Sequence, residues 1–266
     1  MLSCVVNVSE GRAGPVLDAI VAAAASDLLD LHVDPHHHRS VLTLVGEEAP
    51  RRVATAAVLA LDLRRHSGVH PRLGVVDVIP FVALDGDDRV AEVAADRYCA
   101  WSEAVLGVPV FRYGGIGPDL PSIRRGAFRT LRPTAGPGLP HPTAGATAVG
   151  ARPPLVAFNV WLAVPDLRRA RAVARAVRGP ALRALGLAVG DRVQVSMNLL
   201  DPLRIGPAAA HDAVAAHVAV AGAELVGLVP AAVLAAVPGH RLGQLDLAPD
   251  RTIEARVARL RQPDRP

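Results

Sequence analysis

The sequence predicts an α/β protein, and three observations support this fold class. Short stretches rich in branched apolar residues alternate with longer amphipathic stretches along most of the chain. A length of 266 residues is enough to bury one large core or two smaller ones. Residues 132–154, "RPTAGPGLPHPTAGATAVGARPP", interrupt the alternation with glycine and proline. We therefore expect two consecutive α/β subdomains, residues 1–153 and residues 154–266, each with a β-sheet covered by helices.

The expected elements follow the apolar periods in chain order. In the first subdomain the strands are residues 2–9, 28–33, 40–46, 75–84 and 109–113, and the helices are residues 15–27, 50–65 and 88–106. In the second subdomain the strands are residues 155–164, 192–200 and 224–229, and the helices are residues 166–177, 207–221 and 252–260. Because glycine and proline disfavour both helix and strand, residues 132–154 are expected to form a loop or linker.

Composition excludes several classes of function. All 29 basic residues are arginine, they are interleaved with 25 acidic residues, and aromatic residues make up only 3% of the chain, so we do not expect nucleic-acid binding. Cys4 and Cys99 lack metal-ligand or redox spacing and fit buried free thiols in a reducing compartment. No apolar run approaches the roughly 20 residues that span a bilayer, and the N-terminal residues do not resemble a signal peptide. We expect a cytoplasmic protein that does not bind membranes.

The stretch "RRHSGVHPRLGVVDVIPF", residues 64–81, contains the first candidate for catalysis. His66 and His70 have the i, i+4 spacing of a zinc-binding helix, but Gly68 and Pro71 prevent a continuous helical face, so we expect no zinc site. The end of a helix explains the first half of the stretch. A histidine before proline is held in extended geometry, and its imidazole titrates near neutral pH. His70 is therefore a candidate general base.

Three polar segments leave a structural and a functional interpretation open. In "NVSEGR", Asn7 and Glu10 follow a strand, where α/β folds place ligands, or else this turn caps the next helix. The "HHHR" segment, residues 36–39, fits a solvated loop better than a metal site. The glycine-proline loop, residues 136–145, is either a linker or a clamp in which a flat ligand approaches main-chain donors.

Two further asparagines, Asn159 and Asn198, interrupt apolar strands. A buried amide must be hydrogen-bonded, so each belongs either to a polar network in the core or to a pocket wall.

Seven segments in chain order resemble the formiminotransferase domain family: "CVVNVSEGR", "HHHRSVLTLVG", "RRHSGVHPRLGVVDVIPF", "GPGLPHPTAGATAVGAR", "AFNVWL", "VQVSMNLLD" and "ELVGLVP". The resemblance implies two α/β subdomains whose mixed sheets face each other across a ligand channel, with helices outside, and a homodimer. It implies transfer of a formimino group from N-formimino-L-glutamate to N5 of tetrahydrofolate, a step of histidine degradation. We expect the transferase part only, without the cyclodeaminase domain of some members, and tetrahydrofolate as co-substrate with no metal.

The resemblance also assigns roles to residues. It places the catalytic base at His70. It implies folate contacts from the glycine-proline loop, which consists of Gly136, Pro137, Gly138, Leu139, Pro140, His141, Pro142, Thr143, Ala144 and Gly145. Candidate substrate-binding residues are Asn7, Glu10, Asp34, Arg39 and Arg72. Asp34 matches an aspartate of the family's first loop, and arginine forks such as those of Arg39 and Arg72 suit the carboxylates of glutamate.

Three positions depart from the family pattern. Val69 stands where the family often has glutamate before the catalytic histidine, Ser67 where it often has lysine, and His38 where it often has asparagine. A missing carboxylate beside His70 changes the surroundings that set the orientation and pKa of the imidazole. Two alternatives therefore stay open: a divergent folate-dependent one-carbon transferase with another donor or acceptor, and a folate-binding module without catalysis.

Overall fold

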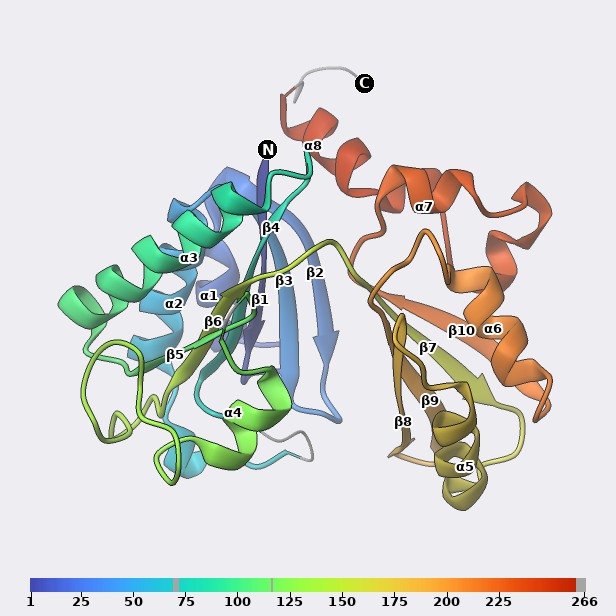
Figure 1. Ribbon diagram of the computed structural model, residues 1–266, viewed down its shortest axis with the longest axis horizontal. Helices are drawn as coiled ribbons and strands as arrows, with labels where there is room; N and C mark the ends of the chain where they lie inside the picture. Colours follow the sequence, from blue (N-terminus) through green and yellow to red (C-terminus); the bar gives the residue numbers. More distant parts are fainter. Residues whose placement is uncertain (69–71, 116, 262–266) are drawn as a thin grey trace. The chain divides into compact units, whose positions relative to one another are not determined.

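The computed structural model describes residues 1–68, 72–115 and 117–261 (Figure 1). The chain divides into two compact units, Met1–Pro153 and Pro154–Pro266. Strands in the described residues form one sheet of six strands and one of four, and helices pack against both sheets. The expected α/β class is thereby confirmed. Within the described residues, no helix has the length and apolar character needed to cross a membrane.

The first unit is built on the six-stranded sheet, in the order β2-β3-β1-β4-β6-β5. Its strands are β1 (Leu2–Val8), β2 (Leu28–Asp34), β3 (Arg39–Val45), β4 (Val76–Ala83), β5 (Val110–Tyr113) and β6 (Thr147–Ala151). Its helices are α1 (Pro15–Ala22), α2 (Glu48–Ala60), α3 (Asp88–Trp101) and α4 (Leu120–Gly126). The four strands from β2 to β4 pair antiparallel, and β4, β6 and β5 pair parallel, so this sheet is mixed as expected.

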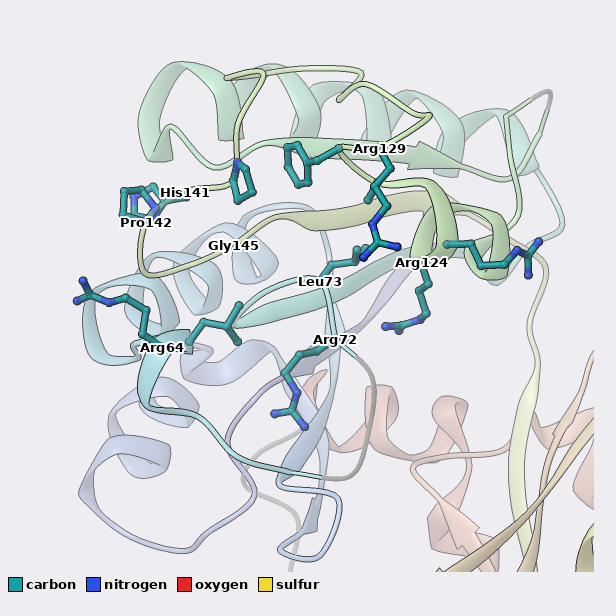
Figure 2. A pocket seen from close by; sticks show the side chains of 13 residues that line it. Arg64, Arg72, Leu73, Arg124, Arg129, His141, Pro142 and Gly145 are labelled. Atoms are coloured by element: carbon teal, nitrogen blue, oxygen red, sulfur yellow. The ribbon is translucent and has the colours of Figure 1, made fainter.

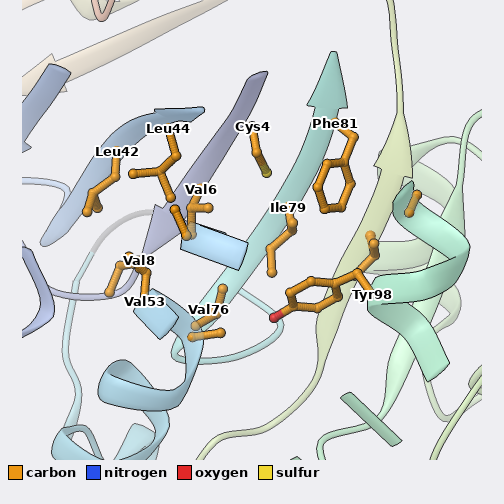
Figure 3. Close-up of a cluster of buried hydrophobic side chains, with 14 of the residues drawn as sticks. Cys4, Val6, Val8, Leu42, Leu44, Val53, Val76, Ile79, Phe81 and Tyr98 are labelled. Atoms are coloured by element: carbon orange, nitrogen blue, oxygen red, sulfur yellow. The ribbon is translucent and has the colours of Figure 1, made fainter. Parts of the chain in front are cut away.

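Alternation along the strands of the first unit separates two apolar clusters. Cys4, Val6 and Val8 of β1 point toward α1, α2 and α3, where Ile79 and Phe81 of β4 pack with Tyr98 (Figure 3). The other face of β4 and its parallel neighbours packs against α4. Helices therefore cover both faces of the sheet near β4, which explains why every residue of that strand is buried.

The second unit is built on the four-stranded sheet, in the order β10-β7-β9-β8. Its strands are β7 (Val156–Leu162), β8 (Leu182–Val189), β9 (Arg192–Leu199) and β10 (Val220–Val226), and its helices are α5 (Leu167–Val177), α6 (Pro207–Ala215), α7 (Ala231–Ala235) and α8 (Ile253–Arg261). Phe158 and Met197 are paired across β7 and β9 and face the apolar cluster that includes Val173 of α5 and Val214 of α6. The side chains that alternate with Phe158 along β7 and with Met197 along β9 point to the opposite face of the sheet.

Asn159 and Asn198 lie on that opposite face. The Asn159 amide donates to Glu224 Oε2 at 3.0 Å, whereas the side chain of Asn198 is exposed. Of the two interpretations, the polar network therefore applies to Asn159, although this network lies across the sheet from the apolar core.

Both units contain the same βαββαβ arrangement. In the first unit it runs from β1 to β4, and in the second from β7 to β10. Numbered within each motif, the strand order is 4-1-3-2 in both sheets. The first unit extends this sheet with β6 and β5, and these added strands carry the connections on which the candidate site depends.

Two expectations about the fold are wrong. Residues 132–154 are not all loop, because β6 lies between β4 and β5 in the sheet. Its small residues permit this close packing: a Cβ at Gly150 would lie 2.4 Å from the carbonyl oxygen of Tyr113. The second sheet is antiparallel rather than mixed among its described strands, because β9 returns from β8 through a tight turn at Gly190 and inserts beside β7.

Other differences concern elements and their ends. The sequence gives no expectation for β8, whose alanines and glycine carry a weak strand signal, or for the short helix α4. Helix α6 ends at Ala215, well before the expected end at residue 221, and β10 begins at Val220. The helices expected over residues 15–27 and 50–65 end early, and each is followed by a separate 3₁₀ turn, Ala25–Asp27 and Leu63–Arg65. Helix α3 continues without a break into a π-helical segment, Ser102–Leu106, so the expected end at residue 106 is confirmed.

The contact between α5 and β8 makes one glycine necessary for the stability of the second unit. A Cβ at Gly186 would lie 2.4 Å from the backbone nitrogen of Arg171, whereas a Cβ at Gly222 in the same sheet would meet nothing within 4 Å. We expect Gly186→Ala to lower the free energy of unfolding by about 2 kcal/mol, since α5 must move outward. Gly222→Ala should leave it unchanged or raise it by up to about 1 kcal/mol. Urea unfolding measures both, and equal effects of the two substitutions would contradict the close packing.

Candidate active site

Three segments of the first unit meet beyond the end of β1. They are the turn after β1, the turn between β2 and β3, and the segment that leads into β4. Gly11 sets the first contact, because a Cβ there would lie 2.1 Å from the carbonyl oxygen of Asp34 and 2.4 Å from the backbone nitrogen of Arg39. Only glycine allows this approach. The "NVSEGR" segment and the turn between β2 and β3 therefore come together, and with them the candidate residues Glu10, Asp34 and Arg39.

Asp34 organises the turn between β2 and β3. Its Oδ1 accepts the backbone N–H groups of His36 and His37 at 2.9 and 2.8 Å, and its Oδ2 pairs with Nδ1 of His37. Burial alone would raise the pKa of Asp34, but the hydrogen bonds and charge of His37, together with the His36 amide, outweigh burial and lower it to about 2. Asp34 is therefore an ionised anchor of this loop.

His66, His38 and Arg72 link that turn to the segment before β4. The rings of His38 and His66 stack with centroids 4.1 Å apart, and a guanidinium nitrogen of Arg72 lies against the ring nitrogens of His66. Burial and the neighbouring charges of Arg72 and His38 lower the pKa of His66 to about 4, so its imidazole is neutral at neutral pH. Arg72 also donates to the carbonyl oxygen of His37 at 3.3 Å.

A buried carboxylate, Asp77 of β4, fixes the other end of this segment. Its side chain is 1% exposed. Oδ1 accepts the backbone N–H of Leu73 at 2.7 Å, and the two carboxylate oxygens accept the guanidinium of Arg124 from α4 at 3.2 and 2.6 Å. Burial lowers the pKa of the nearby Arg39, and the charges of Asp77 and Asp34 oppose that shift. One carboxylate thus joins the entry of β4 to α4.

Sequence reasoning assigned no role to Asp77. The signal was nevertheless present, because an aspartate in the otherwise apolar run "VVDVIPF" must be paired when it is buried. The partner could not be inferred, since Arg124 lies 47 residues away in a helix that the sequence did not predict.

A pocket of about 790 Å³ is lined by Arg124, the partner of this carboxylate (Figure 2). Its walls carry five arginines and a histidine: Arg64, Arg72, Arg124, Arg125, Arg129 and His141. None of the described residues that line it is acidic. A pocket with this lining attracts anions with more than one carboxylate, because guanidinium groups bind carboxylates through paired hydrogen bonds.

The end of the glycine-proline loop forms one wall of the pocket. Pro140, His141, Pro142 and Gly145 line it. The backbones of His141 and Gly145 exchange hydrogen bonds of 2.8 and 2.9 Å, which close a tight turn. Gly145 has a φ of +71°, and a Cβ there would lie 2.4 Å from the carbonyl oxygen of Leu73. The loop therefore packs directly on the segment that leads into β4.

The His141 ring is oriented by its own turn. Its Nδ1 accepts the backbone N–H of Ala144 at 3.0 Å, so in this hydrogen bond the imidazole is neutral and its proton resides on Nε2. His141 thus offers a pocket ligand an N–H donor from a ring that the backbone holds in place.

Residues at the start of the glycine-proline loop lie elsewhere. Gly136 packs against Val108 and Pro109, and Pro137, Gly138 and Leu139 are exposed. Thr143 and Ala144 contribute backbone carbonyls that accept the N–H groups of Leu63 and Val75. The structure brings Pro140, His141, Pro142 and Gly145 to the pocket and does not bring residues 136–139 there.

The remaining candidates have different positions. Asn7 donates to the carbonyl oxygen of Val5 at 3.1 Å within β1. The Glu10 carboxylate accepts the backbone N–H of Arg12 and pairs with His38. His70 and Val69 lie outside the described residues. Among the described residues, no three His, Cys, Asp or Glu side chains are grouped so that they could hold a metal ion.

Comparison with known proteins decides the family. Residues 1–152 match the formiminotransferase domain, N-terminal subdomain. The chain belongs to the formiminotransferase family. It is 35% identical to a glutamate formimidoyltransferase from Streptococcus pyogenes over 91% of this chain and 93% of that protein. It is 32% identical to a glutamate formimidoyltransferase from Thermoplasma acidophilum over 86% of this chain and 88% of that protein.

A longer relative matches over part of its length. The chain is 34% identical to a formimidoyltransferase-cyclodeaminase from Sus scrofa over 86% of this chain, and the match covers 50% of that protein. This formiminotransferase chain thus matches half of the pig relative and nearly the whole of the Streptococcus protein.

The ionised Asp34 makes the stability of this formiminotransferase depend on acid pH. Its pKa of about 2 lies below the ordinary value for an unfolded aspartate, about 4. Its contribution to stability is therefore complete above about pH 4 and is lost as the pH falls toward about 2. We expect Asp34→Asn to make the free energy of unfolding fall less steeply between these two pH values, as followed by urea unfolding. The exposed turn residue Asp191 provides the control Asp191→Asn, which should keep the wild-type slope; an unchanged slope in Asp34→Asn would contradict the pairing.

Proposed function

We propose that this chain is a glutamate formimidoyltransferase, which transfers the formimino group of N-formimino-L-glutamate to N5 of tetrahydrofolate and releases L-glutamate. The carrying observation is the arginine-lined pocket between the glycine-proline loop and the segment that follows His70. Similarity to the Streptococcus glutamate formimidoyltransferase over almost the whole length of both chains supports the same reaction. Tetrahydrofolate acts as co-substrate.

In the proposed reaction His70 is the general base. N5 of the folate attacks the amidine carbon, and the imidazole takes the proton that N5 loses. A bond from N5 to carbon forms, and the bond from that carbon to the glutamate nitrogen breaks. The same imidazole returns the proton to the departing amine, so the reaction needs no other proton source. His70 fits this role because Pro71 restricts its backbone and because an imidazole titrates near neutral pH.

The pocket suits both substrates by charge. Folate and formiminoglutamate both carry glutamate carboxylates, five guanidinium groups line the pocket, and none of the described lining residues is acidic. We assign carboxylate binding to Arg72 and Arg124 first, because Arg124 is already oriented by Asp77. The pterin ring would approach the glycine-proline loop, where the Nε2–H of His141 is the available ring donor. The loops around the bound formiminoglutamate would be held by Asn7, Glu10, Asp34 and Arg39.

The unit boundaries suggest how the domain is divided. Residues 1–153 would be the N-terminal formiminotransferase subdomain, and residues 154–266 the C-terminal subdomain of the same family. The shared βαββαβ topology supports this division. We further propose a cytoplasmic homodimer that requires no metal.

A second candidate is a divergent one-carbon transferase with another donor or acceptor. Val69 and His38 favour it, because they replace residues that the family often has next to the catalytic histidine and the loop arginine.

Titration of the purified chain separates these functions. Tetrahydrofolate should raise the midpoint of thermal unfolding, since it binds only the folded state. Adding formiminoglutamate should then release glutamate in proportion to the folate consumed. Folate binding without glutamate release would favour a divergent transferase or a binding module. An unchanged unfolding midpoint at saturating folate would reject all folate-dependent functions.

Replacing the proposed base tests the mechanism. His70→Asn should lower kcat by about 100-fold or more, because general acid–base catalysis contributes at least that factor. The Kd for tetrahydrofolate should change little, since the carboxylate-binding arginines are intact. His217→Asn, at an exposed position of the second unit, is the control and should keep wild-type kcat. Full activity of His70→Asn would place the base elsewhere.

A further inference from the structure

Both ring nitrogens of His38 face hydrogen-bond acceptors. Nδ1 lies 2.8 Å from the backbone carbonyl oxygen of Ser67, and Nε2 lies 2.9 Å from Oε1 of Glu10. A carbonyl oxygen and a carboxylate cannot donate, whereas a neutral imidazole carries only one N–H. We propose that His38 is an imidazolium that positions the segment carrying His70, an inference that rests on the proposed function of His70 as the base.

The contacts of Glu10 place the proton on His38. Oε1 of Glu10 also accepts the backbone N–H of Arg12 at 2.8 Å, so this oxygen receives two donors. A backbone N–H can only donate, so Oε1 acts as an acceptor at this position. The side chain of His38 is 8% exposed and that of Glu10 is 15% exposed, so water screens the pair poorly.

The charged groups around the stacked rings of His38 and His66 are consistent with a positive charge on His38 and none on His66. His66 stacks on His38 and is neutral at neutral pH, with a pKa lowered to about 4. Arg72 also contacts the His66 ring through a guanidinium nitrogen. In the turn that carries His38, His37 pairs with the ionised Asp34. The stacked pair therefore consists of one imidazolium and one neutral imidazole, which keeps two cations from facing each other.

The fixed element is the backbone just before His70. His38 holds the carbonyl of Ser67, and Gly68 follows in a space closed on three sides. A Cβ at Gly68 would lie 2.7 Å from a guanidinium nitrogen of Arg72, 2.9 Å from Cβ of His38 and 3.0 Å from the carbonyl oxygen of His37. On the other side of His70, Asp77 holds the N–H of Leu73. His38 and Asp77 thus anchor the two ends of the segment that contains the proposed base.

The backbone of His38 explains which residues can stand there. Its φ is +52°, in the left-handed region that asparagine and glycine adopt more readily than other residues. Asparagine or glycine would satisfy this backbone conformation but would carry no charge. Histidine adds a second donor and a positive charge for Glu10, so it links the turn after β1 to Ser67.

Nitrogen NMR tests the protonation directly. In long-range proton–nitrogen spectra of the full chain at neutral pH, both ring nitrogens of His38 should show the shift of a protonated nitrogen. The signals are assigned as those missing from His38→Asn. One nitrogen with the shift of an unprotonated acceptor would overturn the imidazolium. This result does not depend on catalysis, so it separates failure of this inference from failure of the proposed function.

Kinetics tests the positioning role. His38→Gly keeps the backbone conformation and removes both donors, so kcat should fall about 10-fold or more while KM for both substrates changes less than about threefold. His38→Asn keeps one donor and should lie between the glycine variant and the wild type. His36→Asn is the matched control in the same turn and should keep wild-type kcat.

Unchanged kcat in His38→Gly would overturn the positioning role. The positioning role would also be overturned if His38→Gly lowered both kcat and the thermal unfolding midpoint, and if kcat returned to the wild-type value at a lower assay temperature. That result would indicate a purely structural role.

Discussion

The ion pair between Asp77 and Arg124 is the interaction on which the candidate site depends. Asp77 is almost fully buried, and its carboxylate accepts hydrogen bonds from Arg124 and from the backbone of Leu73. Burial of a carboxylate is costly unless geometry and hydrogen bonding compensate for lost water. Here the same carboxylate accepts a backbone N–H of the segment that leads into β4, and it orients the guanidinium of Arg124, which lines the pocket. Removing it would take this acceptor away from the Arg124 guanidinium and from the backbone N–H of Leu73.

The topology explains why the described residues of the second unit contain no counterpart of this ion pair. Both units repeat the βαββαβ motif, but only the first extends its sheet with β6 and β5. The extension brings α4 over the outer face of β4 and returns the glycine-proline loop to the segment before β4. Gly74 and Gly145 pair as an isolated bridge at that point. The connections of the extra strands therefore supply two walls of the pocket that the motif alone lacks.

Local chemistry made the main elements predictable from the sequence. Short apolar stretches rich in branched residues predicted β1, β3 and β4. The partners of the site residues were not predictable, because they come from long-range pairing: Glu10 meets His38 across 28 residues, and His38 meets Ser67 across 29. Strand β6 escaped prediction because its alanines and glycine carry a weak strand signal. His70 remains a prediction, since it lies outside the described residues.

The central claim is that the carboxylate of Asp77 and the guanidinium of Arg124 act as one unit, and a double-mutant cycle measures this most directly. Asp77→Asn, Arg124→Gln and the double variant are compared with the wild type by urea unfolding. We expect a coupling free energy of about 2 kcal/mol, because directly bonded groups in one network are strongly non-additive. Effects of the two single substitutions that add to within about 0.5 kcal/mol would contradict the account.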